Sequence, residues 1–124
     1  MDIESVAQDL VDAAIQVHRT LGPGLLESAY QACLAHDLTK RGRRVECELP
    51  LPLEYDGVRI DAGYRLDMRV DGLVLVENKV VETLLPVHQA QFITYLKLTG
   101  RSLGFLINWN VTLLRDGRDQ ARCP

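Results

Sequence analysis

The stretch LVLVENKV, residues Leu73–Val80, ends a strongly apolar run in three polar residues. Consecutive aliphatic side chains predict a buried β-strand. Glu77 and Lys79 lie two residues apart, so in a strand both side chains point to the same face. A carboxylate and an ammonium at the end of a buried strand indicate either an ion pair at a frayed end or a functional site.

A second acid, Asp67, lies in the preceding segment YRLDMRV, ten positions before Glu77. The turn signal Asp71-Gly72 separates the two segments and predicts an antiparallel hairpin. The length of the loop decides whether the two carboxylates meet, because a shift of one residue moves a side chain to the other face of the sheet.

A two-residue loop would place Asp67 opposite Val76, with Glu77 on the other face. A three-residue loop, Val70–Gly72, would instead place Asp67 opposite Leu75 and make Glu77 its diagonal neighbour on the same face. We expect this three-residue loop, or an equivalent bulge, since only then do the two acids share one pocket.

Two carboxylates that converge in this way repel each other and are costly to bury unless a cation joins them. Oxygen ligands with room for water are what Mg²⁺ or Mn²⁺ prefers. Such an ion polarises a phosphate and lowers the pKa of a bound water. Lys79 would orient that water or neutralise charge that develops on the phosphorus oxygens. A structural cluster of ion pairs is the competing interpretation.

The hydrophobic periodicity predicts three helices. Apolar residues recur at helical spacing over residues 3–19, and the sequence LGPG at Leu21–Gly24 ends this helix. A second helix is expected over residues 25–41. Pro86 suits the first position of a third helix, residues 87–98.

The other segments show the alternation that is typical of strands. The stretch RVECELPLPLEY predicts an edge strand, because it contains two prolines. YDGVRIDAGYRLDMRV predicts a turn at Asp56-Gly57 followed by one long strand, and SLGFLINWNV and TLLRDGRD predict a fourth strand and a short closing element. The order α-α-β-β-β-α-β predicts an α/β (α+β) fold in which helices cover a mixed central β-sheet.

With 124 residues, 47% of them hydrophobic and 25% charged, the chain is typical of one soluble globular domain over residues 1–124. No apolar run approaches the roughly 20 residues that a membrane-spanning helix needs. The acidic, amphipathic N-terminus lacks the basic and apolar regions of a signal peptide. We therefore expect a cytoplasmic protein that has no membrane partner.

The formal net charge of −3 gives no general attraction to a polyanion, so contact with nucleic acid would need a local basic patch. The stretch KRGRR, Lys40–Arg44, places four cations in five positions, either as such a patch or as the solvated end of a helix. Cys33, Cys47 and Cys123 include no C-x-x-C pair. They predict reduced thiols, the first two packed as small apolar groups.

Four sequence elements, namely GLLESAY, Asp67, the ENK segment and QFITY, resemble in this order those of known families. GLLESAY, Gly24–Tyr30, matches the motif of the GxxExxY protein family. Asp67, followed by Glu77 and Lys79, matches the D…ExK signature of the PD-(D/E)XK nuclease superfamily, to which that family is assigned. QFITY, Gln91–Tyr95, matches the Q-x-x-x-Y signature of its exonuclease-like branch. The resemblance covers nearly the whole chain.

This resemblance implies a restriction-endonuclease-like core with a metal site at one end of the central hairpin. Asp67 and Glu77 would hold Mg²⁺ or Mn²⁺, and Glu27 would be a further ligand or would hold a metal-bound water. Lys79 would assist the attacking water. Leu66 stands where the superfamily name has proline, which is a loosely defined position.

The helical residues of the motifs also have plain structural explanations. Gln91 and Tyr95 would help to position the lysine, the water or the substrate phosphate, but four-residue spacing also suits a surface pair. Glu27, in the first turn of a helix, is favourable without any metal. Tyr30, one turn later, suits a core aromatic residue with a hydrogen-bonded hydroxyl.

The leading hypothesis is a metal-dependent nuclease that hydrolyses phosphodiester bonds of DNA or RNA. The alternative is a non-catalytic adaptor that keeps the nuclease fold and binds a protein or nucleic-acid partner. Intact D…ExK residues favour the enzyme, whereas the negative net charge and the lack of a substrate-reading element favour the adaptor. A homodimer is compatible with either, since two subunits would assemble a basic groove that one chain lacks.

Overall fold

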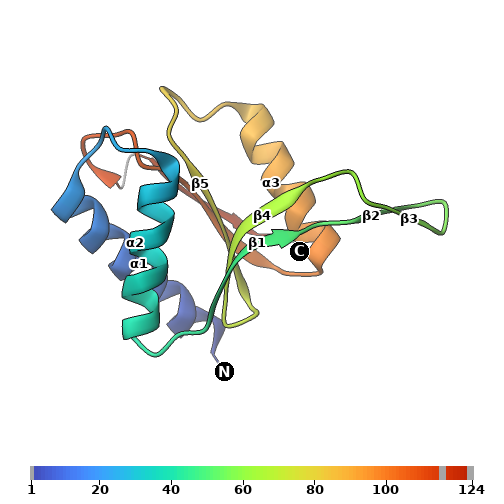
Figure 1. Ribbon diagram of the computed structural model, residues 1–124, viewed down its shortest axis with the longest axis horizontal. Helices are drawn as coiled ribbons and strands as arrows, with labels where there is room; N and C mark the ends of the chain where they lie inside the picture. Colours follow the sequence, from blue (N-terminus) through green and yellow to red (C-terminus); the bar gives the residue numbers. More distant parts are fainter. Residues whose placement is uncertain (1, 115–116, 123–124) are drawn as a thin grey trace.

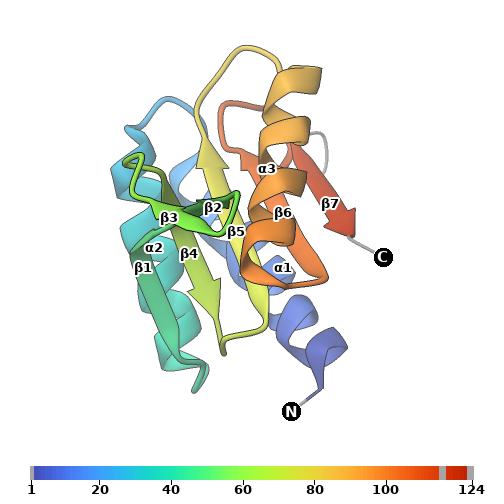
Figure 2. The same cartoon turned by 90° about the vertical axis from the view of Figure 1, so that its right-hand side faces the viewer.

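The computed structural model describes residues 2–114 and 117–122 and shows a mixed sheet with helices on both faces (Figures 1 and 2). Its elements are α1 (Ile3–Leu21), α2 (Glu27–Lys40), β1 (Val45–Pro50), β2 (Leu53–Tyr55), β3 (Val58–Ile60), β4 (Arg65–Val70), β5 (Val74–Lys79), α3 (Pro86–Thr99), β6 (Leu103–Asn108) and β7 (Arg118–Arg122). The main sheet has the strand order β1-β4-β5-β6-β7. Strands β5 and β6 are parallel and the other neighbours are antiparallel, so the predicted mixed sheet is confirmed.

The sheet separates two hydrophobic cores. On one face, α1 and α2 pack against the sheet through side chains such as Leu10 and Leu34, which join Val76 of β5. On the other face, Phe92 of α3 packs against Leu75 of β5. Strand β5 therefore contributes to both cores, as expected of a run of aliphatic residues in the middle of a sheet.

The three predicted helices are present, with shifted ends. Helix α1 continues to Leu21. Helix α2 begins at Glu27, because the preceding Leu26 is extended with φ −68° and ψ 147°. Helix α3 begins at Pro86 as expected, and Gly100 ends it in the left-handed conformation, with φ 68°.

Two of the predicted strands are each divided. RVECELPLPLEY forms β1 and β2, and the segment after Asp56-Gly57 forms β3 and β4 instead of one long strand, so that prediction was wrong. Pro52 lacks the amide that a ladder needs, and Gly63, with φ 80°, redirects the chain before β4. Strands β2 and β3 pair only with each other and project from the sheet (Figure 1). We call residues 51–64 the arm.

After β6 the chain forms strand β7, which pairs with β6. In the predicted closing element TLLRDGRD, residues 115–116 lie outside the described part of the chain. Cys123 lies outside it as well. None of the described helices is both long and apolar enough to cross a membrane.

Two of the four cations of the basic stretch KRGRR form ion pairs within the fold. Arg43 Nε donates to Asp9 Oδ2 over 2.8 Å, and Arg43 Nη1 donates to Asp71 Oδ2 over 3.1 Å. Arg41 pairs with Asp37 over 3.2 Å. Arg43 therefore ties the end of α2 to α1 and to the β4–β5 turn, at the end of the sheet opposite the arm (Figure 1). Arg41 adds a longer contact of 3.8 Å with Asp9 of α1.

The two described cysteines are free and exposed, so their predicted packing as small apolar groups was wrong. Cys33 lies on α2 and Cys47 on β1. Strand β1 is at the edge of the main sheet, where a side chain has a neighbouring strand on one side only.

Candidate active site

The turn between β4 and β5 sets the register of the two acidic strands. Val70 pairs with Val74, which leaves Asp71–Leu73 as a three-residue loop. The predicted loop length is confirmed, but its predicted position, Val70–Gly72, was wrong. The first two loop residues have φ angles of 52° and 68°, and the amide of the third donates to Val70 O over 3.0 Å. The turn therefore closes on Val70 and keeps it in the ladder.

Continuing this register brings Asp67 directly opposite Glu77. The backbone ladder ends at Met68 and Val76, one residue before this pair. Beyond that point, hydrogen bonds from backbone amides to side-chain carboxylates join the two strands. Asp67 N donates to Glu77 Oε1 over 2.8 Å, and Asn78 N donates to Asp67 Oδ2 over 2.8 Å. The expected pairing of Asp67 with Leu75 was wrong, because Leu75 pairs with Arg69. The acids lie side by side, directly instead of diagonally.

Asp67 also lacks ladder pairing on its other side, where the β1–β4 ladder skips Glu48 and Asp67. Glu48 has φ 56°, an uncommon value for a residue other than glycine. Its side chain reaches α2, where Gln31 Nε2 donates to Glu48 Oε1 over 3.0 Å. Beside this gap is a cavity of about 460 Å³, lined by Glu27, Ser28, Gln31, Ala32, Cys47, Glu48 and Asp67.

The acids lie in surroundings that disfavour their ionisation. Glu77 is 6% exposed, and burial followed by the charge of Asp67 raises its pKa to about 8. Burial also raises the pKa of Asp67 to about 6, with further increases from the charges of Glu27 and Glu48. Lys79 lowers the pKa of both acids, but less than burial raises it. The charged forms of both acids are therefore disfavoured mainly by burial, which Lys79 offsets only in part.

This donor set fits a divalent cation. Each of the two acids gives one oxygen to a backbone amide, and no other described residue hydrogen-bonds to the remaining oxygen of either. Glu27, the first residue of α2, lines the same cavity as Asp67. The described residues contain no group of three or more His, Cys, Asp or Glu side chains close enough to hold a metal ion. Glu27 is thus not brought into one ligand group with Asp67 and Glu77.

Helix α3 brings one of its two motif residues near the acids. Tyr95 is buried, and burial followed by the charge of Glu77 raises its pKa, so its phenol lies near the acids. Gln91, one turn earlier, is exposed and makes no side-chain hydrogen bond to a described residue of the site. Lys79 is partly buried at the end of β5, where its carbonyl accepts a bond of 2.9 Å from Trp109 N.

Asn78 supports the site and was missed by the sequence reasoning. It is completely buried on the face opposite Glu77. Its Oδ1 accepts from Trp109 Nε1 over 2.9 Å, and its Nδ2 donates to Gln31 Oε1 over 3.3 Å. This network fixes the end of β5 against α2 and the residue after β6. A polar residue between Glu77 and Lys79 in an otherwise apolar strand was the available signal.

The structural explanation of Tyr30 is confirmed. Its ring stacks on Trp109 with centroids 4.9 Å apart. Its hydroxyl donates to Gly22 O over 2.6 Å and accepts from Leu25 N over 3.1 Å. Tyr30 thereby fixes the loop before α2, and with it the position of Glu27.

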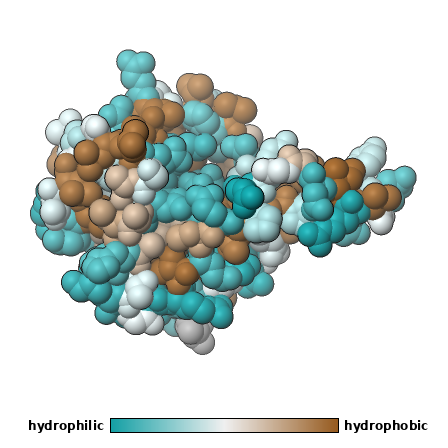
Figure 3. Space-filling model, in the orientation of Figure 1, coloured by the Kyte–Doolittle hydropathy of each residue, from teal (hydrophilic) through white to brown (hydrophobic). Residues whose placement is uncertain are grey.

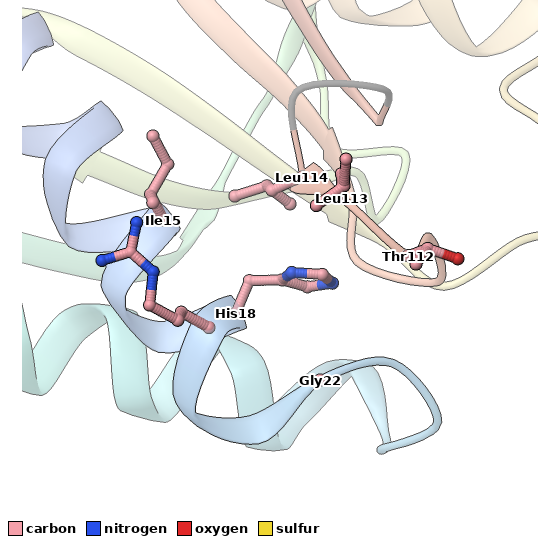
Figure 4. A pocket seen from close by; sticks show the side chains of 7 residues that line it. Ile15, His18, Gly22, Thr112, Leu113 and Leu114 are labelled. Carbon is pink, nitrogen blue, oxygen red and sulfur yellow. The ribbon is translucent and has the colours of Figure 1, made fainter.

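A second cavity, of about 510 Å³, lies between the end of α1 and the segment after β6. Figure 4 shows His18 pointing from α1 towards that segment, among apolar side chains such as Ile15 and Leu114. His18 Nε2 lies 2.9 Å from Val111 O, which gives this histidine a structural contact. No carboxylate or thiol of the described residues lines this cavity, so it offers no comparable chemistry.

The comparison with protein families agrees with this geometry. The model of the PD-(D/E)XK nuclease superfamily matches residues 4–121, which include Asp67, Glu77 and Lys79. No curated protein and no solved structure matches the chain. The mixed sheet flanked by helices is consistent with a restriction-endonuclease-like fold. On the match over almost its whole length, the chain belongs to the PD-(D/E)XK nuclease superfamily.

Proposed function

We propose that the protein is a metal-dependent nuclease that hydrolyses phosphodiester bonds of DNA or RNA. The observation that carries this proposal is the direct apposition of the buried Glu77 and the half-buried Asp67. Among the described residues neither acid pairs with an arginine, and each keeps one carboxylate oxygen that accepts no hydrogen bond. Membership of a nuclease superfamily supports it. The GLLESAY motif further supports assignment to the GxxExxY family.

Asp67 and Glu77 would hold Mg²⁺ or Mn²⁺ through the oxygens that their backbone contacts leave free. When bound, such an ion polarises a phosphate and favours ionisation of a water molecule. Mg²⁺ is commonly held by one or two carboxylates, with water and substrate phosphate as its other ligands. Glu27 would then act from the wall of the cavity, through water.

Lys79 would supply positive charge on the same face as Glu77. Its ammonium would orient the attacking water and neutralise charge that develops on the phosphate oxygens. Tyr95, close to Glu77, would hold the lysine or the water in place with its hydroxyl. The exposed Gln91, one helical turn earlier, would contact the phosphate of the substrate.

The test is incubation of the protein with labelled single- and double-stranded DNA and RNA in the presence of Mg²⁺ or Mn²⁺. The native protein should cleave at least one substrate, and Lys79→Ala should slow cleavage roughly 10²- to 10³-fold, the usual effect of removing one stabilising donor. Lys97→Ala removes an exposed lysine of α3 and should leave the rate unchanged. Failure of the native protein to cleave all four substrates would contradict the proposal.

A non-catalytic adaptor is the second candidate. It is favoured by the net charge of −3 and by the ion pairs that occupy Arg41 and Arg43, which leave less positive surface for a polyanion. In that case nucleic acid or a protein partner would bind without being cleaved. Association of two subunits would provide a larger basic surface, and sedimentation analysis would show it.

A further inference from the structure

The aromatic side chains of this protein are distributed unevenly. The chain has four tyrosines, two phenylalanines and one tryptophan, all within the described residues. Only Tyr55 and Tyr64 are exposed, by 75% and 42%, and the other rings are at most 6% exposed. Both exposed rings lie on the arm. An aromatic ring that is not fully covered by the protein keeps surface that a ligand can contact.

Tyr64 is the last residue of the arm and packs against Tyr95 of α3. Its ring centroid is 6.4 Å from that of Tyr95, with the planes at 61°. Tyr95 in turn lies close to Glu77 and Asp67, whose charges act on its phenol. The backbone of Tyr64 is fixed, because Leu51 N donates to Tyr64 O over 2.8 Å. A half-exposed ring with a hydrogen-bonded backbone thus packs against Tyr95, a residue of the proposed site.

Positive charge follows this ring in the sequence. Arg65, the first residue of β4, is exposed, and its Nη1 reaches Glu48 O over 3.4 Å. Arg65 therefore lies at the gap in the sheet beside Asp67. A guanidinium that meets a phosphate while a neighbouring ring stacks on a base is the usual arrangement for single-stranded nucleic acid.

The arm itself does not present a continuous apolar face. Figure 3 shows hydrophilic and hydrophobic residues next to one another along the arm, at the right of the view. Exposed Tyr55 and Val58 face each other across the two strands, and the charged pair Glu54 and Arg59 follows in the ladder. This alternation does not provide the broad apolar interface that a protein partner would need, but it leaves the exposed ring of Tyr55 available for a smaller contact.

We propose that Tyr64 stacks on an unpaired nucleobase of a single-stranded nucleic acid, while Arg65 contacts a phosphate of the same strand. Tyr55 stacks on a base further along the strand. This inference rests on the proposed function and names its substrate class. Bases inside a duplex are stacked on one another, so only an unpaired base or an opened end offers Tyr64 a free face.

The test measures the binding of labelled oligonucleotides by fluorescence anisotropy, with Ca²⁺ in place of Mg²⁺. The probes are single-stranded DNA, single-stranded RNA, a blunt DNA duplex and a single strand of abasic nucleotides. Tyr64→Ala should weaken binding of both single strands about 5- to 100-fold. It should leave the duplex and the abasic strand at native affinity. Tyr64→Phe should bind within about twofold of the native protein, since the ring is kept.

Leu98→Ala is the matched control, because Leu98 is 38% exposed and lies on α3. It should bind all four probes as the native protein does. The inference is overturned if Tyr64→Ala binds single strands normally, if it loses the abasic strand equally, or if Tyr64→Phe loses as much as Tyr64→Ala. It is also overturned if sedimentation shows that Tyr64→Ala dissociates a dimer, because a second copy of the chain would then cover the arm.

Cleavage of the same probes in Mg²⁺ separates this inference from the proposed function. A native protein that cleaves nothing but binds single strands through Tyr64 would contradict the nuclease and support the stacking site. A native protein that cleaves, with Tyr64→Ala equally active on normal and abasic strands, would support the nuclease and contradict the stacking site.

Discussion

The acids at the two ends of the β4–β5 hairpin have different partners. At the turn, Asp71 accepts from the Arg43 guanidinium over 3.1 Å and from Arg44 N over 2.8 Å, and its side chain is 5% exposed. At the open end, Asp67 and Glu77 accept only backbone amides from the described residues. The carboxylate at the turn is thus paired with an arginine, whereas the two carboxylates at the open end form no ion pair with a described residue.

This difference distinguishes an acid that stabilises the fold from two acids that are available to bind a ligand. A carboxylate that is bound by a guanidinium has its charge satisfied within the chain. Two adjacent carboxylates without such a partner keep a raised pKa and gain most when a cation arrives. The comparison therefore predicts that substitutions at the two ends will have different consequences.

The largest expected effect is on catalysis. Asp67→Asn and Glu77→Gln should each reduce cleavage roughly 10²- to 10³-fold or more, because metal assistance contributes several kcal/mol to such a reaction. Asp71→Asn should keep the native rate but lower the melting temperature, since the turn loses charge-assisted hydrogen bonds. Cleavage rates and melting curves of the three variants check this. Equal loss of activity in all three variants would contradict the different roles assigned to the acids at the two ends of the hairpin.

The second expected effect is on the pH dependence of stability in the metal-free protein. The folded pKa values of about 6 for Asp67 and about 8 for Glu77 exceed the unfolded values of about 3.9 and 4.3. The folded state therefore binds more protons, and its stability falls as the pH rises from about 4 through about 8. The slope is about 1.4 kcal/mol per pH unit for each extra proton.

Urea unfolding in EDTA at a series of pH values measures this slope. Glu77→Gln should make the curve flatter between about pH 6 and pH 8, because it removes the group with the higher pKa. Glu46 provides a contrast of opposite sign, since its hydrogen bond with Arg69 lowers its pKa and its contribution is lost only as the pH falls. An unchanged slope in Glu77→Gln would contradict the assignment.

The third expected effect is stabilisation by metal. At ten times its Kd, a ligand that binds only the folded state adds about 1.4 kcal/mol, which corresponds to a rise of about 5 °C for a domain of this size. Mg²⁺ or Mn²⁺ should produce this shift in the native protein and in Asp71→Ala, and not in Asp67→Ala. The same shift in Asp67→Ala would place the metal elsewhere.

The smallest expected effect concerns the loop that positions Glu27. Tyr30→Phe keeps the stacking on Trp109 but removes the hydroxyl that bonds Gly22 O and Leu25 N. We expect a loss of about 1–2 kcal/mol in the free energy of unfolding. Activity should fall less than in Asp67→Asn, because the two acids stay in place. Urea unfolding and cleavage rates measure the two effects.

Local sequence patterns predicted those parts of the fold that local physics determines. The apolar run of β5 and the Pro86 start of α3 were predicted because burial and backbone chemistry are visible in a few residues. The arm was not predicted, because YDGVRIDAGYRLDMRV keeps a strand-like alternation through the point where the chain leaves the sheet. Gly63 interrupts that alternation, but an isolated glycine in a strand pattern is also typical of a bulge within one strand, so it does not show that β3 leaves the main sheet.

The sequence predicted which acids form the candidate site, but it predicted their arrangement only in part. The convergence of Asp67 and Glu77 followed from alternation along strands, but their register depended on the φ angles of the turn. The left-handed backbone of Glu48 has no local signal, because glutamate is not among the residues enriched in that conformation. The support that Asn78 receives from Trp109 joins residues 31 positions apart, which no local pattern reports.

The most direct test of the central claim is anomalous diffraction from crystals of the native protein soaked in Mn²⁺. The account predicts one anomalous peak between the carboxylates of Asp67 and Glu77, within coordination distance of an oxygen from each and absent in Asp67→Ala crystals. A native crystal in which Mn²⁺ binds elsewhere, or in which the two acids remain without a cation at saturating Mn²⁺, would contradict it.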